Sequence, residues 1–216
     1  MTELVASNVC LEVGTTPILK DASVSLRPGE LVAILGPNGA GKTSLLRTLL
    51  GISKPTRGST TLNGETCFGM SPSERAKIVS YLPQRRPLAW PYRVHDVVAL
   101  GRFAHGAALG RLSPTDSAAV NDAIAACKLD ELQHRSTDNL SGGELARVHF
   151  ARAIAGKAPL LIADEPVAEL DPRHQLLVAD LIRQFVNDGG GALVVLHEVA
   201  LAARIAAAIF SYLCVL

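Results

Sequence analysis

A glycine-rich stretch near the N-terminus constrains this chain more than any other feature of its sequence. Gly36-Pro37-Asn38-Gly39-Ala40-Gly41-Lys42-Thr43 matches the pattern GxxxxGK(S/T) in full. It follows an apolar run, Leu31 to Leu35, and precedes a segment of helical character, Lys42 to Leu50. Such a loop curls so that its N–H groups point at phosphate oxygens, and the helix adds the positive end of its dipole. The pattern predicts a phosphate-binding loop between a buried strand and a helix.

The chemistry of this loop assigns roles to its side chains. Lys42 is expected to reach the β and γ phosphates of ATP, and the Thr43 hydroxyl to ligate Mg²⁺. A chance glycine-rich turn is the alternative, and the strand before the loop and the helix after it make that alternative improbable. The residues expected to hold the nucleotide here are Gly36, Pro37, Asn38, Gly39, Ala40, Gly41, Lys42, Thr43 and Ser44.

A second apolar run ends in two adjacent carboxylates. Leu160 to Ala163 reads as a strand, and Asp164 and Glu165 follow it directly. Asp164 is expected to hold the Mg²⁺ shell, and Glu165 to polarise the attacking water. Two acids after a strand are more often a solvated strand end, but together with the phosphate loop they predict ATP hydrolysis.

A third motif points to one family. Leu140-Ser141-Gly142-Gly143-Glu144 resembles the LSGGQ sequence of ATP-binding cassette (ABC) proteins. Ser141 and Glu144 also form a capping box, so a helix is expected to begin here. The resemblance implies that Ser141, Gly142 and Gly143 form an anion site at this helix end, which closes on the γ-phosphate held by a second subunit. A helix cap with no further role is the alternative.

Three smaller motifs fall in the order of the same family. Tyr81-Leu82-Pro83-Gln84 resembles the Q-loop, which implies that Gln84 contacts Mg²⁺ and nucleotide. Glu169-Leu170-Asp171-Pro172 resembles the loop that crosses the dimer interface. Leu196-His197-Glu198 resembles the switch histidine, which implies that His197 contacts the γ-phosphate and takes part in catalysis. The resemblance covers nearly the whole chain and implies a head-to-tail homodimer of cassettes.

Strands that alternate with helices predict an α/β fold with a parallel sheet. The first thirty residues read as short strands joined by turns. The pattern is mostly helical from about Ser71 to Cys127, which we interpret as an inserted helical subdomain. We expect one ABC ATPase domain over residues 1–216. It would have a P-loop NTPase core with a parallel sheet, an N-terminal antiparallel β subdomain and a helical subdomain at roughly 85–157.

A further segment resembles one subgroup within this family. Ala99 to His105 looks like the VxxGRxPH segment of ATPases that serve iron-chelate, haem and cobalamin importers. This implies integral membrane permease subunits as partners and, through them, a substrate-binding protein. Permease contact is expected at the helical subdomain and at the loop after Gln84, and substitution of Arg102 or of residues just after Gln84 is expected to weaken coupling to the permease. The implied place is the cytoplasmic face of the inner membrane, where the chain would be peripheral because no apolar stretch approaches the ~20 residues that span a bilayer.

Composition bears on the competing interpretations. Lys plus Arg number 21 against 20 for Asp plus Glu, so there is no electrostatic case for a nucleic-acid partner. The four cysteines lack metal-ligand spacing and are expected to be free thiols. A soluble single-cassette ATPase, such as an iron–sulfur assembly factor, is the alternative to a transporter. A P-loop kinase or GTPase is disfavoured by Leu140 to Glu144.

The chain departs from the family pattern in two places. An aromatic residue that stacks on adenine is expected near Val13 or Gly14, and none is present between Glu3 and Glu30. We therefore expect weak discrimination between ATP and GTP. The chain also ends in an apolar run, Ile209 to Leu216, before the further elements usual in the family. We expect either a final strand that closes the fold unaided or a shortened chain with a poorly ordered tail.

Overall fold

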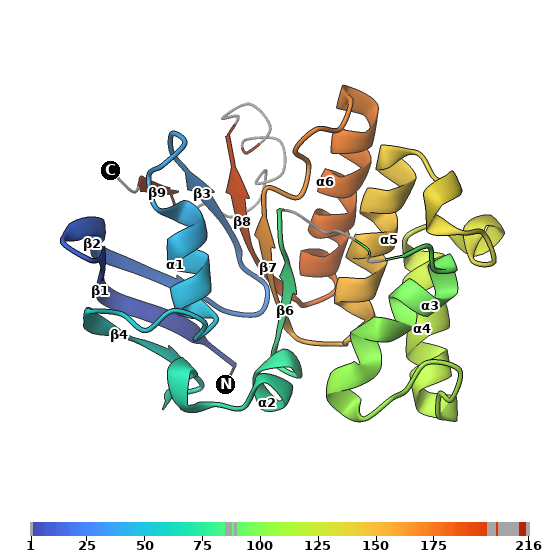
Figure 1. The fold of residues 1–216 in the computed structure, drawn as a ribbon, viewed down its shortest axis with the longest axis horizontal. Helices are drawn as coiled ribbons and strands as arrows, with labels where there is room; N and C mark the ends of the chain where they lie inside the picture. The colour runs from blue at the N-terminus through green and yellow to red at the C-terminus, as the bar shows by residue number, and fades with distance from the viewer. Residues whose placement is uncertain (1, 85–87, 89, 198–201, 203–211, 215–216) are drawn as a thin grey trace.

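The protein has two sheets and a group of helices arranged in a row. The structure, a computed structural model, describes residues 2–84, 88, 90–197, 202 and 212–214. Figure 1 shows an antiparallel sheet at one end, a parallel sheet in the middle and the helices at the other end. Helix α1 (Lys42–Leu49) lies between the two sheets. This arrangement is the α/β fold expected from the alternation of strands and helices.

The N-terminal part forms the antiparallel sheet. Its strands are longer than the short strands expected, because β1 and β2 have 10 and 11 residues. Register shifts interrupt the pairing of β1 with both of its neighbours. The order across the sheet is β2 (Thr16–Leu26), β1 (Leu4–Val13), β4 (Arg57–Leu62) and β5 (Glu65–Thr66).

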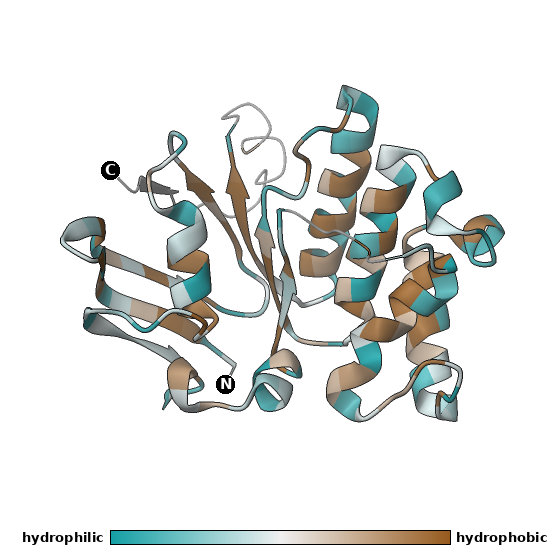
Figure 2. Cartoon of the chain, viewed as in Figure 1, coloured by the Kyte–Doolittle hydropathy of each residue, from teal (hydrophilic) through white to brown (hydrophobic). Residues whose placement is uncertain are grey.

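The parallel sheet stands between two apolar cores, which explains its uninterrupted apolar runs. Alternate residues of β3, Val32 and Ile34, pack against α1 and the antiparallel sheet, while Leu31 and Ala33 face the helices on the other side. Both faces are therefore shielded from water, and β3 and β8 are brown along most of their length in Figure 2. The order is β6 (Val79–Leu82), β7 (Leu160–Asp164), β8 (Gly191–Leu196), β3 (Leu31–Leu35) and β9 (Tyr212–Cys214).

The helices lie on the side of the parallel sheet away from α1 (Figure 1). Apolar side chains of α3, α4 and α5 pack on one another and on the sheet. None of the helices in the described part of the chain is long and apolar enough to cross a bilayer. The helices on this side are α3 (Val94–Ala99), α4 (Pro114–Ala126), α5 (Gly142–Ala155) and α6 (Pro172–Asn187), with short 3₁₀ turns η2 (Leu100–His105), η3 (Asp130–Leu132) and η4 (Thr137–Asn139). The turn η1 (Cys67–Gly69) and helix α2 (Pro72–Ala76) are exceptions, because they connect the antiparallel sheet to β6.

The helical interpretation of the stretch from Ser71 was wrong at one element. Val79 to Leu82 form β6, the edge strand of the parallel sheet, which pairs with β7. Four residues are too few to show a period by themselves, and only the pairing with β7 identifies the strand. Helices α3, α4 and α5 follow between β6 and β7. Of the C-terminal apolar run, Tyr212–Cys214 form β9 beside β3, and the remaining residues lie outside the described part.

Candidate functional site

The glycine-rich loop joins β3 to α1, as the sequence predicted. Gly39 and Gly41 have φ values of 84° and 82°, in the left-handed region that glycine adopts without strain. Gly41 also has no room for a side chain, because a Cβ there would lie 2.7 Å from the Ile18 carbonyl oxygen. The loop therefore folds tightly against β2, and the N–H groups at the start of α1 are left for a ligand.

Lys42 lies beneath this loop with its side chain almost fully enclosed. Its Nζ donates to the carbonyl oxygens of Gly36 and Pro37, at 2.8 Å each. An ammonium group carries three donors, so two bonds fix its position and one remains for an anion. The loop and its own lysine thus place a positive charge where phosphate oxygens would lie.

Asp164, the last residue of β7, is a buried carboxylate with spare bonding capacity. It is 1% exposed, and its Oδ1 has no hydrogen-bond partner within the described residues. Burial raises the pKa of Asp164 above its usual range; a hydrogen bond with Thr43 lowers it, and the charge of Glu165 raises it. An unpartnered buried carboxylate oxygen is costly, and a hydroxyl beside it completes an oxygen donor set suited to a hard divalent cation. Asp164 and Thr43 therefore fit Mg²⁺.

Glu165 is held by two side chains from neighbouring strands. Gln84 Nε2 donates to its Oε2 at 2.5 Å, and His197 Nε2 contacts its Oε1. The backbone of Glu165 has a φ of 48°, an uncommon conformation for a residue with a side chain, which surrounding structure must hold in place. Its N–H donates to the Val195 carbonyl oxygen of β8 at 3.2 Å.

Parallel pairing explains why residues far apart in sequence meet here. β6, β7, β8 and β3 are neighbours in this order, and every pair is parallel. Gln84, Glu165, His197 and the glycine-rich loop each follow one of these strands. Because the carboxyl ends of parallel strands lie at one edge of a sheet, all four arrive at the same place.

These residues line one cavity of about 480 Å³, a size usual for small-molecule sites. Its wall also includes Ile18 of β2, which the sequence analysis did not identify. Nothing in the local pattern marks Ile18, because its approach to the loop depends on how β2 packs. Val13, in the region where an aromatic residue was expected, is 66% exposed. The lining residues are Ile18, Asn38, Gly39, Gly41, Lys42, Thr43, Ser44, Gln84, Glu165 and His197.

The Ser141 motif lies at the start of α5 and does not line this cavity. The predicted capping box is confirmed: Ser141 Oγ accepts from the Glu144 N–H at 3.3 Å, and Glu144 Oε2 accepts from the Ser141 N–H at 2.8 Å. These two bonds hold the pKa of Glu144 below its usual range. Gly142 and Gly143 follow as the first residues of the helix. Hydrogen bonds between near neighbours in sequence therefore cap this helix, and no residue of the cavity takes part in the capping.

The segment Gly101 to His105 fixes the other end of α5. Arg102 is 5% exposed, pairs with Asp116 Oδ1 at 2.8 Å and donates to the Ala155 carbonyl oxygen at 3.0 Å. His105 Nε2 lies 3.0 Å from the Gly156 carbonyl oxygen. Both bonds satisfy carbonyl groups at a helix C-terminus, which have no partner within the helix. The Arg102 guanidinium is therefore enclosed and fixes the end of α5, and the weaker permease coupling expected on its substitution stays a prediction.

Comparison with known proteins agrees with these motifs. The family described as ABC transporter matches residues 19–168. The chain is 40% identical over 199 residues to the hemin import ATP-binding protein HmuV of Pseudomonas entomophila, covering 90% of this chain and 76% of that protein. It is 37% identical over 195 residues to the cobalamin import ATP-binding protein BtuD of Halobacterium salinarum, covering 90% of this chain and 48% of that protein.

Solved structures share the fold. One, described as an ATP-binding subunit of an ABC transporter, has a TM-score of 0.82 at 23% identity and covers 98% of this chain and 85% of its own. Another, an ATP-binding cassette of an ABC transporter in its ADP conformation, has a TM-score of 0.81 at 20% identity. It covers 100% of this chain and 90% of its own. Likeness at these identities concerns the architecture alone.

Proposed function

Because the chain belongs to the ABC transporter family, we propose that it powers an importer for haem, cobalamin or an iron chelate. Members of this family bind and hydrolyse ATP, and this chain is an ATPase subunit. The observation that carries the proposal is the meeting of Lys42, Asp164, Glu165 and His197 at one edge of the parallel sheet. The relatives named for hemin and cobalamin import support the class of cargo.

ATP binding uses the loop between β3 and α1. The backbone amides of residues 36–44 and the free donor of Lys42 hold the phosphates. The donor set for Mg²⁺ is Thr43 and Asp164, with the amide oxygen of Gln84 as a third ligand. Bound there, the ion would neutralise charge on the phosphates.

Glu165 is the residue that orients and polarises the attacking water. Its carboxylate is fixed from both sides, by Gln84 and by His197. A fixed acceptor needs little rearrangement when the water loses a proton, which lowers the barrier to attack. His197, which lines the same cavity, also contacts the γ-phosphate when ATP is present. Gln84 lies between β6 and α3 in the chain. A change at its side chain when ATP binds is therefore passed to the helices.

The site is completed by a second copy of the chain. Ser141, Gly142 and Gly143 offer a hydroxyl and helix N-terminal amides but lie outside the cavity of their own chain. In a head-to-tail homodimer this surface meets the γ-phosphate held by the partner, with Glu169 to Pro172 at the same interface. Two ATP molecules then join two chains, and hydrolysis separates them.

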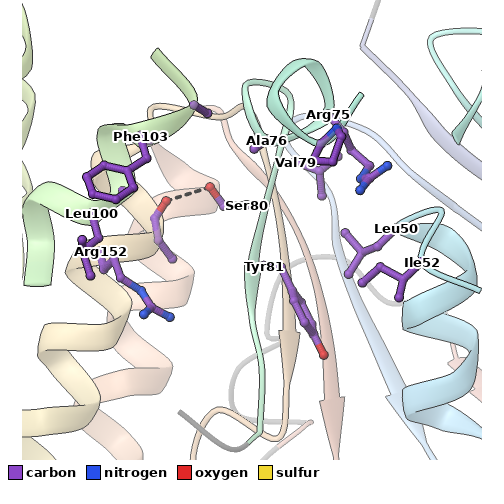
Figure 3. Close-up of a pocket in the computed structure, with 15 residues that line it drawn as sticks. Leu50, Ile52, Arg75, Ala76, Val79, Ser80, Tyr81, Leu100, Phe103 and Arg152 are labelled. Atoms are coloured by element: carbon purple, nitrogen blue, oxygen red, sulfur yellow. Dashed lines mark hydrogen bonds between the residues drawn. The ribbon is translucent and has the colours of Figure 1, made fainter. Parts of the chain in front are cut away.

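The permease docks in an apolar cleft between the α/β core and the helices (Figure 3). The cleft has a volume of about 390 Å³, and Ile52 and Phe103 on its two sides are 49% and 50% exposed. Figure 3 shows Leu50 and Ile52 on one side, with Leu100, Phe103 and Arg152 on the other. A permease segment seated there touches both parts, so a rearrangement between them moves it. This would place the chain at the cytoplasmic face of the inner membrane, with a substrate-binding protein reached through the permease.

Reconstitution in vesicles tests the proposal. The chain, its permease and a binding protein should give ATP-driven uptake of haem, cobalamin or an iron chelate. Ile52→Glu, which puts a charge at the rim of the cleft, should lower uptake about ten-fold or more while the isolated chain keeps its ATP affinity. Lys20→Glu, at an exposed position of β2, is the matched control. A wild-type chain that joins no permease would support the alternative, a soluble single-cassette ATPase such as an iron–sulfur assembly factor.

A further inference from the structure

The imidazole of His174 occupies the space where Gly143 would carry a side chain. A Cβ built on Gly143 would lie 1.9 Å from His174 Cδ2 and 2.2 Å from its Cγ. The preceding glycine, Gly142, has nothing within 4 Å of the same position. Gly143 therefore cannot be replaced without displacing the ring, and the N-termini of α5 and α6 meet through this contact.

A second set of contacts fixes the imidazole from the other side. His174 Nδ1 lies 2.6 Å from Asp171 Oδ2, and the His174 N–H donates to Asp171 Oδ1 at 3.0 Å. Asp171 is the N-cap of α6, so its carboxylate holds the start of the helix and the ring together. The bonds with His174 hold the pKa of Asp171 below its usual range, so the carboxylate is ionised at neutral pH. A ring held in this way has little freedom to turn away from Gly143.

The contact links two helix starts, each of which is capped by residues of its own segment. The capping box of Ser141 and Glu144 completes the start of α5, and Asp171 completes the start of α6. In the proposed dimer both segments face the partner chain, so their relative position decides how well the second half of the ATP site fits. We propose that His174 is a positioning residue that locks the segment 169–172 to Gly143, so that both move together when the dimer closes. The inference rests on the proposed dimeric ATPase.

A cycle of substitutions tests the steric part. Gly143→Ala should lower the melting temperature by about 4 °C or more, because its methyl group and the ring cannot share the space. The double variant Gly143→Ala/His174→Ala should recover most of that loss, since the obstacle is gone. Gly142→Ala, at an open position of the same helix, should not lower the melting temperature. A Gly143→Ala variant as stable as Gly142→Ala would show that the ring does not hold this position.

Turnover tests the positioning role. In the full-length chain, His174→Ala should lower kcat about ten-fold while ATP affinity changes less than about two-fold, because the cavity itself is untouched. His174→Phe keeps a ring over Gly143 but loses the bond to Asp171. It should retain the melting temperature and still lose kcat, which a packing role alone would not produce. His134→Ala, at an exposed position, is the control.

The outcomes separate this inference from the proposal beneath it. Wild-type kcat in either His174 variant, with normal ATPase activity in the parent, would overturn the positioning role. A parent chain that hydrolyses ATP with no dependence on protein concentration would instead overturn the dimer on which the inference rests.

Discussion

The cavity beside the parallel sheet and the start of α5 are built in opposite ways. The cavity gathers residues that are far apart in sequence, such as Gln84, Glu165 and His197, and none of them forms a site alone. The start of α5 is capped by two residues close in sequence, Ser141 and Glu144. The cavity depends on contacts between distant segments, whereas the start of α5 depends on local contacts and its residues do not line the cavity.

The two constructions imply different roles in the proposed dimer. In the proposed dimer, the cavity of one chain sets the affinity for ATP, and the helix end of the other chain controls when hydrolysis occurs. Substitutions in the cavity should therefore alter binding or chemistry in the isolated chain. Removal of the Ser141 hydroxyl at the helix end should alter turnover in the dimer and leave ATP binding by the isolated chain unchanged.

The largest effect is expected for Glu165→Gln, which keeps the size of the side chain and removes its charge. Turnover should fall about 10²- to 10⁴-fold, because the water loses the group that polarises it. ATP should still bind, and the variant should accumulate as an ATP-bound dimer in size-exclusion chromatography. Near-normal hydrolysis would remove Glu165 from this role. Glu131→Gln, at an exposed position, is the matched control.

Lys42→Ala in the cavity and Ser141→Ala at the start of α5 should differ most clearly in their effects on ATP affinity. Lys42→Ala should weaken ATP binding by the isolated chain about ten- to a hundred-fold, the range for a lost hydrogen bond to a charged group. Ser141→Ala should leave that affinity unchanged and lower turnover in the dimer. Titration of each variant with ATP at low protein concentration measures the difference. Equal losses of affinity would mean that Ser141 acts within its own chain.

A smaller effect is expected where the sequence lacks the adenine-stacking aromatic. The cavity offers Ile18, an aliphatic side chain, so affinities for ATP and GTP should lie within about ten-fold of each other. Val13→Trp, at an exposed position of the same sheet, should raise ATP affinity about ten-fold by adding a stacking surface. A strong ATP preference in the parent chain would show that another residue already supplies that surface.

The smallest effect is expected on the melting temperature when Asp116, near the C-terminus of α5, is replaced, and this effect depends on pH. Hydrogen bonds from Ser113 and Arg102 hold the pKa of Asp116 below its usual range. A lowered pKa contributes stability above the unfolded value of about 3.9, and this contribution is lost as pH falls through the folded value. Asp116→Asn should therefore melt below the parent at pH 7, with a gap that narrows below about pH 4. Asp138→Asn, which is exposed, should show no such trend.

Much of the site was predictable because its motifs are short and local. The loop between Leu31–Leu35 and α1, the acids after β7 and the capping box each carry their chemistry within a few residues. The structure places Gln84 and His197 beside Glu165, in agreement with the family order of the motifs. Three of the four cysteines, Cys10, Cys67 and Cys127, are buried free thiols, as expected. Glu198 and, in the loop after Gln84, residues 85–87 and 89 lie outside the described residues.

The features that the sequence patterns did not predict depend on contacts between distant segments. Val79–Leu82 is a strand only because β7 lies beside it, and Arg102 is buried only because Asp116 and the end of α5 surround it. The approach of Ile18 to the loop and of His174 to Gly143 also joins distant segments. Patterns of period and charge describe what a segment can do alone, so they do not report which distant segment will enclose it.

Local patterns in the chain were enough to predict the chemistry of this protein: a phosphate loop, two acids after a buried strand and a capped helix end. These depend on backbone freedom at glycine, on apolar runs and on hydrogen bonds between near neighbours. Which of these groups come into contact depends on how distant segments pack. The parallel register of β6, β7, β8 and β3 brings Gln84, Glu165 and His197 to one edge. It leaves Ser141 outside, because α5 packs on the face of the sheet away from α1.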